Sequence, residues 1–184
     1  MTTTVRAGPG RSTAARPRAS GPEHRILVEI LVCGSLDRGD DAAALAAVPA
    51  IRAALPSDAR LRVVGLLDID DLLAVARGAG AVIVDAAVGI PPGRIVTLPL
   101  TGLIGREGLQ PRSSHALAFR EVIGLAELLR GVPMVGQIVA VGASRFTPGK
   151  PLSRPVSAAI PALVEATLAA AERTRLAVAV TQRW

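Results

Sequence analysis

The stretch Ile26-Leu27-Val28-Glu29-Ile30-Leu31-Val32-Cys33, followed at once by Gly34-Ser35-Leu36-Asp37-Arg38-Gly39-Asp40-Asp41, decides the fold. Its first half is a near-continuous apolar run that only Glu29 interrupts, which is typical of a strand buried on both faces of a sheet. Its second half is a loop that ends in two acidic residues, which suit the start of a helix. The stretch therefore predicts a strand, a loop and a helix in succession.

The same alternation continues along the chain. Short runs rich in valine and isoleucine predict further strands at 61–66, 81–85, 94–98 and 137–141. Apolar residues at helical spacing predict helices at 40–55, 68–77 and 115–130, and a last helix that Ser153 begins, with Pro155 in its first turn. Strands that alternate with helices predict an α/β fold: a three-layer sandwich with a largely parallel twisted sheet and helices on both faces.

The chain divides into a tail and one domain. Residues 1–24 are rich in Thr, Ala, Gly, Pro, Ser and Arg and show no apolar periodicity. Such a composition cannot bury enough surface to fold, so it predicts a disordered tail. The segment 25–184 has the length of a single domain with a substantial core, and we expect it to be one α/β domain.

Composition argues against several classes of function. The formal net charge is +6, but most of the excess lies in the tail, and the chain has one Trp, two Phe and no Tyr. Few aromatic residues and a nearly neutral domain disfavour nucleic-acid binding. The longest charge-free run, 131–144, is shorter than the ~20 residues of a membrane span. We expect a cytoplasmic protein without membrane insertion, and the lone Cys33 to be a buried core thiol.

Three segments concentrate ionisable groups directly after apolar runs. Asp40 and Asp41 follow the first strand, Asp85 ends the run 81–84, and His115 stands at the start of a helix. In parallel sheets, ligands bind beyond the carboxyl ends of the strands, so these groups can meet at one edge. Two carboxylates and an imidazole are a ligand set for a divalent metal ion, and we therefore select Asp41, Asp85 and His115 as the candidate site.

Each of these residues also has a purely structural interpretation. An aspartate after the first strand can cap the helix, and we expect Asp40 to serve the cap and loop and Asp41 to remain for a ligand. Asp85 can be held by a backbone N–H or by an ion pair with an arginine such as Arg38. His115 can be an ordinary surface residue at a helix start, with Ser114 as its N-cap.

The residues also resemble a known family. Gly34–Asp41 is similar to the loop G-N-x-x-x-G-D-[DE] of hydrogenase maturation proteases, and Ile83–Ala86, with Pro92-Gly93 downstream, is similar to their I-V-D-A and P-G segments. Ser113–His115 resembles their [ST]-[ST]-H segment, and 152–161 resembles their S-x-x-V-x-x-A-I stretch. The four motifs occur in the family order, and the resemblance covers roughly residues 26–170.

This resemblance implies a peptidase-like domain and an endopeptidase that removes the C-terminal extension from the precursor of a nickel–iron hydrogenase large subunit, after nickel insertion. It assigns the metal-binding triad to Asp41, Asp85 and His115, which contact nickel in the substrate or hold a bound divalent metal ion. The alternative is a non-catalytic chaperone of the same fold that binds the metal or the precursor.

Several positions depart from the family pattern. Ser35 replaces an asparagine, Ala42 and Ala44 replace glycines, and Gly142-Ala143-Ser144-Arg145 replaces a G-x-Q-P segment. These changes leave the three triad positions intact, so they affect loop shape and substrate contacts.

Overall fold

A five-stranded sheet forms the centre of the molecule in the computed structural model, which describes residues 25–102 and 119–182. The strands are β1 (Val28–Cys33), β2 (Ala59–Gly65), β3 (Gly80–Ala87), β4 (Ile95–Pro99) and β5 (Gly136–Gly142), in the spatial order β2-β1-β3-β5-β4. Neighbouring strands pair in parallel except β4, which runs antiparallel to β5. The predicted α/β class and largely parallel sheet are therefore confirmed.

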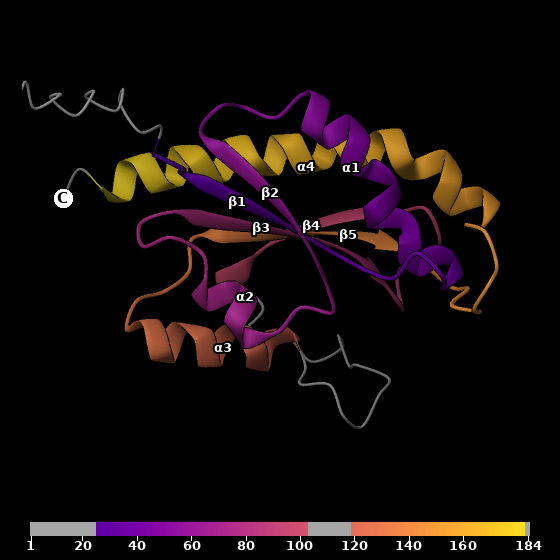
Figure 1. The fold of residues 1–184 in the computed structure, drawn as a ribbon, viewed down its shortest axis with the longest axis horizontal. Helices are drawn as coiled ribbons and strands as arrows, with labels where there is room; N and C mark the ends of the chain where they lie inside the picture. The colour runs from indigo at the N-terminus through magenta and orange to yellow at the C-terminus, as the bar shows by residue number, and fades with distance from the viewer. Residues whose placement is uncertain (1–24, 103–118, 183–184) are drawn as a thin grey trace, which may run out of the picture.

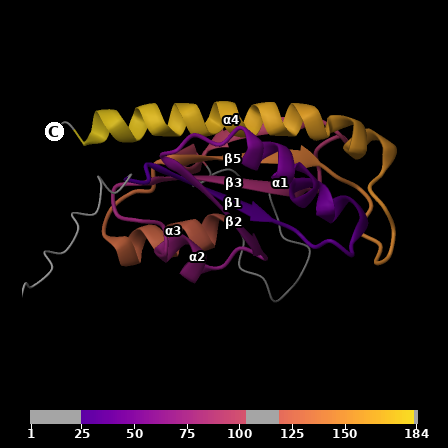
Figure 2. The same cartoon turned by 45° about the horizontal axis from the view of Figure 1, so that its top comes forward.

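Helices cover both faces of this sheet, as the sequence predicted (Figure 1). One face carries α1 (Ala43–Ala53) and the long α4 (Arg154–Thr181), and the other carries α2 (Ile69–Leu73) and α3 (Phe119–Arg130). Two short 3-10 helices, η1 (Gly39–Ala42) and η2 (Leu100–Gly102), lie at strand ends. Figure 2 shows the three layers from a second direction, with α4 extending along one side of the sheet.

Two hydrophobic cores follow from the alternation of side chains along the strands. Val82 and Val84 of β3 pack into the core under α1 and α4, whereas Ala81 and Ile83 pack into the core under α2 and α3. All six residues of β1 are buried, as expected for a central strand with helices on both faces. No helix among the described residues is long and apolar enough to cross a membrane.

The sequence predicted most element positions but not all of their ends. The predicted helix at 40–55 begins as the 3-10 helix η1, and the one at 68–77 is the shorter α2, where the side chains of Asp68 and Asp71 form a capping box. The Arg130 guanidinium donates to the carbonyls of Leu72 and Val75, at 3.1 and 2.8 Å, just where α2 ends. The predicted tail lies outside the described residues, as does the start of the predicted helix 115–130.

Glu29, which interrupts the first apolar run, is buried in an ion-pair network. Its Oε2 lies 2.9 Å from Nε of Arg62, and its Oε1 accepts a hydrogen bond from the backbone N–H of Ala76 at 3.2 Å. Arg62 also donates to the backbone carbonyl of Asp71 at 2.7 Å. The network joins β1, β2 and α2, and it explains how a charged residue is tolerated in a central strand.

We expect Arg62→Met to lower the free energy of unfolding by about 3 kcal/mol, because it leaves the buried Glu29 carboxylate without its cation. Urea unfolding at pH 7 measures this change. Arg60→Met, at an exposed position of the same strand, is the control and should change stability by less than about 0.5 kcal/mol. An equal effect of the two substitutions would contradict a structural role for the Glu29–Arg62 pair.

Candidate active site

Two of the three candidate residues lie at the carboxyl edge of the sheet. Val32 of β1 pairs with Val84 of β3, so Cys33 and Asp85 follow at the same level of the two neighbouring strands. The chain then turns at Gly34 and enters η1, which contains Asp41. Burial first, and then the negative charge of Asp41, raise the pKa of Asp85, so the two carboxyl groups lie within electrostatic reach of each other.

Asp85 lies inside β3 rather than at its end, which corrects the prediction of a strand over 81–85. The strand continues to Ala87 because Asp85, Ala86 and Ala87 pair with Ala140, Val141 and Gly142 of β5. By alternation with Ile83, the Asp85 side chain lies on the face covered by α2 and α3. The carboxyl group is therefore placed against the core on that side.

The surroundings of Asp85 favour its neutral form. Burial raises its pKa to about 7, the N–H of Ala86 opposes that rise through a 2.7 Å hydrogen bond, and the charge of Asp41 adds to it. Among the residues that the structure describes, no basic side chain forms an ion pair with Asp85. Arg38 is therefore not an ion-pair partner of Asp85, whereas the backbone N–H part of the alternative is present.

Asp41 is half-buried at the start of the α1 region. Burial raises its pKa, while the Arg38 guanidinium and a hydrogen bond from the backbone N–H of Ser35 act in the opposite direction. The net pKa remains above the ordinary value. A carboxyl group held by one backbone donor, with Asp85 nearby, retains oxygen lone pairs for a cation.

Asp40 is fully buried and serves the loop, as the sequence predicted. Its carboxylate does not cap α1 but accepts hydrogen bonds from backbone N–H groups of the distant segment 144–153. These bonds hold the pKa of Asp40 below its ordinary value although burial acts to raise it. Both carboxylate oxygens of Asp40 thus have backbone donors, whereas the Asp41 carboxylate has no ion-pair partner among the described residues.

Cys33 also lies near this edge of the sheet, which the sequence did not predict. It is buried, as predicted, but it lies in the electrostatic field of Asp85, Asp71 and Asp41. Burial first, and then these three charges, raise the pKa of its thiol far above the ordinary value. Cys33 is therefore a neutral thiol in the core under α2 and α3, and it is poorly suited to act as a nucleophile.

His115 lies outside the described residues. The described chain resumes with α3 at Phe119, whose side chain packs against the core on the Asp85 face. Across residues 25–102 and 119–182, no three histidine, cysteine, aspartate or glutamate side chains gather closely enough to hold a metal ion. The described part of the chain thus places two carboxyl groups, those of Asp41 and Asp85, at the candidate site.

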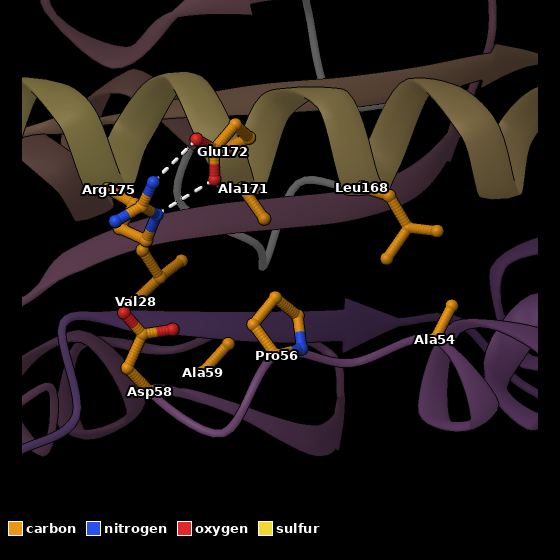
Figure 3. A pocket seen from close by; sticks show the side chains of 9 residues that line it. All are labelled: Val28, Ala54, Pro56, Asp58, Ala59, Leu168, Ala171, Glu172 and Arg175. Atoms are coloured by element: carbon orange, nitrogen blue, oxygen red, sulfur yellow. Dashed lines mark hydrogen bonds and ion pairs between the residues drawn. The ribbon is translucent and has the colours of Figure 1, made fainter. Parts of the chain in front are cut away.

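A small cavity of about 80 Å³ lies away from these acids (Figure 3). It lies between the start of β1 and α4, and Val28, Pro56 and Leu168 are among the residues that line it. Glu172 and Arg175 form an ion pair of 2.6 Å at its rim. The cavity is at the amino end of the parallel strands, so it is not part of the candidate site.

Comparison with known proteins identifies the family. A family model described as hydrogenase maturation protease (HycI) matches residues 66–170, which is more than half of the chain. The chain belongs to the hydrogenase maturation protease family. This membership confirms the resemblance found in the sequence motifs, and hydrogenase maturation proteases are endopeptidases that process the hydrogenase large subunit.

Solved structures of hydrogenase maturation proteases have the same fold. The hydrogenase maturating endopeptidase HybD from E. coli is 22% identical with a TM-score of 0.66, over 80% of this chain and 93% of that one. The [NiFe] hydrogenase maturation protease HybD from Thermococcus kodakarensis is 24% identical with a TM-score of 0.61, over 78% and 98% of the two chains. No curated protein matches the chain in sequence.

Proposed function

We propose that this protease removes the C-terminal extension from the large-subunit precursor of a nickel–iron hydrogenase after nickel insertion, in the cytoplasm. Asp41, Asp85 and His115 are its metal-contacting residues in this proposal. The main support is the state of Asp85. Its carboxyl group has a pKa of about 7, lies beside a second carboxyl group and has no cationic partner in the described chain. Perturbed acids in such a setting are typical of functional sites.

The two carboxyl groups fit a divalent cation for electrostatic reasons. Without a cation, burial and mutual repulsion disfavour having both groups ionised. A divalent cation reverses this preference, because it stabilises the two carboxylates together and offsets their desolvation. An imidazole from His115 would complete a set of oxygen and nitrogen ligands that suits nickel and similar borderline ions.

A divalent cation bound at such a site polarises a carbonyl group and makes water a stronger nucleophile. The chain's own residues prepare the site for it. Asp85 must give up its proton when the cation arrives, which a pKa of about 7 allows at neutral pH. The backbone N–H of Ala86 orients the Asp85 carboxylate through its 2.7 Å hydrogen bond.

The test is to incubate the protein with purified nickel-loaded precursor and to measure the intact mass of the precursor. We expect the precursor to lose the mass of its C-terminal extension, whereas nickel-free precursor should stay intact. Addition of free Ni²⁺ or Zn²⁺ to the nickel-free precursor separates the two sources of the metal. Cleavage under those conditions would place a divalent ion on the protease, and its absence would leave nickel in the substrate as the contacted ion.

The same experiment separates the protease from a non-catalytic chaperone of this fold. A chaperone would form a stable complex with the precursor and leave its mass unchanged over the whole incubation. An unchanged mass of nickel-loaded precursor, with a complex detectable by size-exclusion chromatography, would overturn the proposed cleavage.

A further inference from the structure

Asp40 connects two loops that are more than one hundred residues apart in sequence. Its Oδ2 accepts hydrogen bonds from the backbone N–H groups of Ser144 and Arg145, at 3.2 and 3.1 Å. Its Oδ1 accepts one from the N–H of Ser153, at 2.6 Å. Both carboxylate oxygens are therefore occupied by main-chain donors of the segment 144–153, which joins β5 to α4.

The main chain around Asp40 reinforces this connection. The N–H of Asp40 donates to the carbonyl of Arg145 at 2.7 Å, and the N–H of Gly149 donates to the carbonyl of Asp37 at 2.7 Å. The backbone approaches so closely at Gly39 that a Cβ there would lie 2.5 Å from the Arg145 carbonyl oxygen. The segment 34–42, which we call the acidic loop, is thus fastened to 144–153 along much of its length.

This fastening bears directly on Asp41, the next residue. Consecutive residues of a 3-10 helix point about 120° apart, so Asp40 can face the segment 144–153 while Asp41 turns to the sheet edge. The position of the Asp41 main chain is then set by the bonds of Asp40. Within the described residues, the Asp41 carboxylate forms no ion pair that could hold the loop in place. Burial raises its pKa, and the nearby Arg38 charge opposes that rise.

We propose that Asp40 is a positioning residue, which fixes Asp41 relative to Asp85 by locking the acidic loop onto the segment 144–153. The inference rests on the proposed function only for its effect on cleavage, since the placement of Asp41 can be measured without substrate. A carboxylate is required at position 40 because it presents two acceptors to three donors. Asparagine would turn an NH2 group toward at least one of these N–H groups.

Two substitutions test this role. Asp40→Asn keeps the size of the side chain and removes one acceptor. Ser153→Pro keeps Asp40 and removes the donor to Oδ1. Ser153 has φ −66° and ψ 151°, which proline adopts, and its side chain makes no capping bond to α4. The second variant therefore remains informative if Asp40→Asn does not fold.

Glu29→Gln is the matched control. Glu29 is also a buried carboxylate whose two oxygens face an arginine and a backbone N–H, so the same exchange of oxygen for NH2 occurs there. It lies four residues before Cys33 on β1, ~13 Å further from the carboxyl edge by the rise of a strand. Its loss should destabilise the fold without moving Asp41.

The first measurement is amide hydrogen exchange at Asp41, whose N–H donates to the backbone carbonyl of Arg38 at 3.3 Å. We expect this exchange to become at least about tenfold faster in Asp40→Asn and in Ser153→Pro. It should be unchanged in Glu29→Gln. The second measurement is kcat for cleavage of nickel-loaded precursor, which should fall at least about tenfold in the first two variants with little change in KM.

The outcomes separate the two proposals. Unchanged exchange of the Asp41 amide in both Asp40→Asn and Ser153→Pro would overturn the positioning role, whatever the activity. Equal losses of kcat in Glu29→Gln and Asp40→Asn would also overturn it, since they would show a general effect of destabilisation. If the unsubstituted protein does not cleave the precursor, the proposed function fails, and exchange of the Asp41 amide alone decides the role of Asp40.

Discussion

Asp85→Asn should abolish cleavage of the precursor and, at pH 8 without added metal, make the protein more stable. The substitution keeps the shape of the side chain and the acceptor for the Ala86 N–H, but it removes the negative charge. Cleavage needs that charge if Asp85 contacts a divalent cation, so the expected loss of activity is at least about 1000-fold. Stability should rise because a buried charge next to Asp41 is no longer formed.

The size and pH dependence of this gain follow from the pKa. The pKa of Asp85 is about 7 in the folded chain and ~3.9 in an unfolded one. Between these values the unfolded chain has lost its proton and the folded one has kept it, so stability falls as pH rises from ~4 to ~7 and then levels off. Three pH units correspond to at most about 4 kcal/mol, and partial solvent exposure of Asp85 reduces this to about 2 kcal/mol.

Thermal melts of both proteins in EDTA at pH 5 and pH 8 check this expectation. The Tm advantage of Asp85→Asn should be larger at pH 8 than at pH 5, and it should disappear when a tightly bound divalent ion stabilises the unsubstituted protein. Asp37→Asn removes an exposed carboxylate from the same edge and should change neither cleavage nor Tm.

His115→Ala should abolish cleavage as well. Retained cleavage in both Asp85→Asn and His115→Ala would reject the proposed site.

The pattern of apolar runs was sufficient to predict the sheet. Buried strands such as β1 and β3 can be recognised as continuous runs of valine, isoleucine and leucine, because both of their faces are covered. The direction of β4 was not predicted. Its reversal has a local cause, since the connection from Ala87 to Ile95 is too short for the crossover that a parallel strand requires.

Part of the candidate site could likewise be predicted from local sequence, whereas the part that depends on distant segments could not. Asp41 and Asp85 could be selected from the sequence because each follows an apolar run, and parallel strands bring such positions to one edge. The bonds from Asp40 to Ser144, Arg145 and Ser153 could not be selected. They join main-chain N–H groups, which every residue type except proline supplies, so no residue pattern marks them.

A substitution at Gly34, where β1 leads into the acidic loop, is the second change for which we expect a large loss of cleavage. Its φ is +117°, a conformation that residues with a Cβ rarely adopt, and an added Cβ would overlap the backbone carbonyl oxygen of Asp41. Gly34→Ala should therefore displace Asp41 or its loop rather than a flexible side chain. We expect cleavage to fall about 100-fold, because displacements of ~1 Å at a reacting site have effects of that size.

Gly131→Ala is the matched control for this prediction. Gly131 follows α3, outside the acidic loop and the segment 144–153, and it also has a positive φ, +70°, but a Cβ there would meet nothing within 4 Å. It should therefore show only the backbone strain, a loss of stability of roughly 1–2 kcal/mol, with cleavage unchanged below its Tm. Gly34→Ala combines that kind of strain with the overlap at Asp41. If both variants melt early but cleave the precursor at the same rate, the close contact between Gly34 and Asp41 does not hold the site, whereas a loss confined to Gly34→Ala ties catalysis to the position of Asp41.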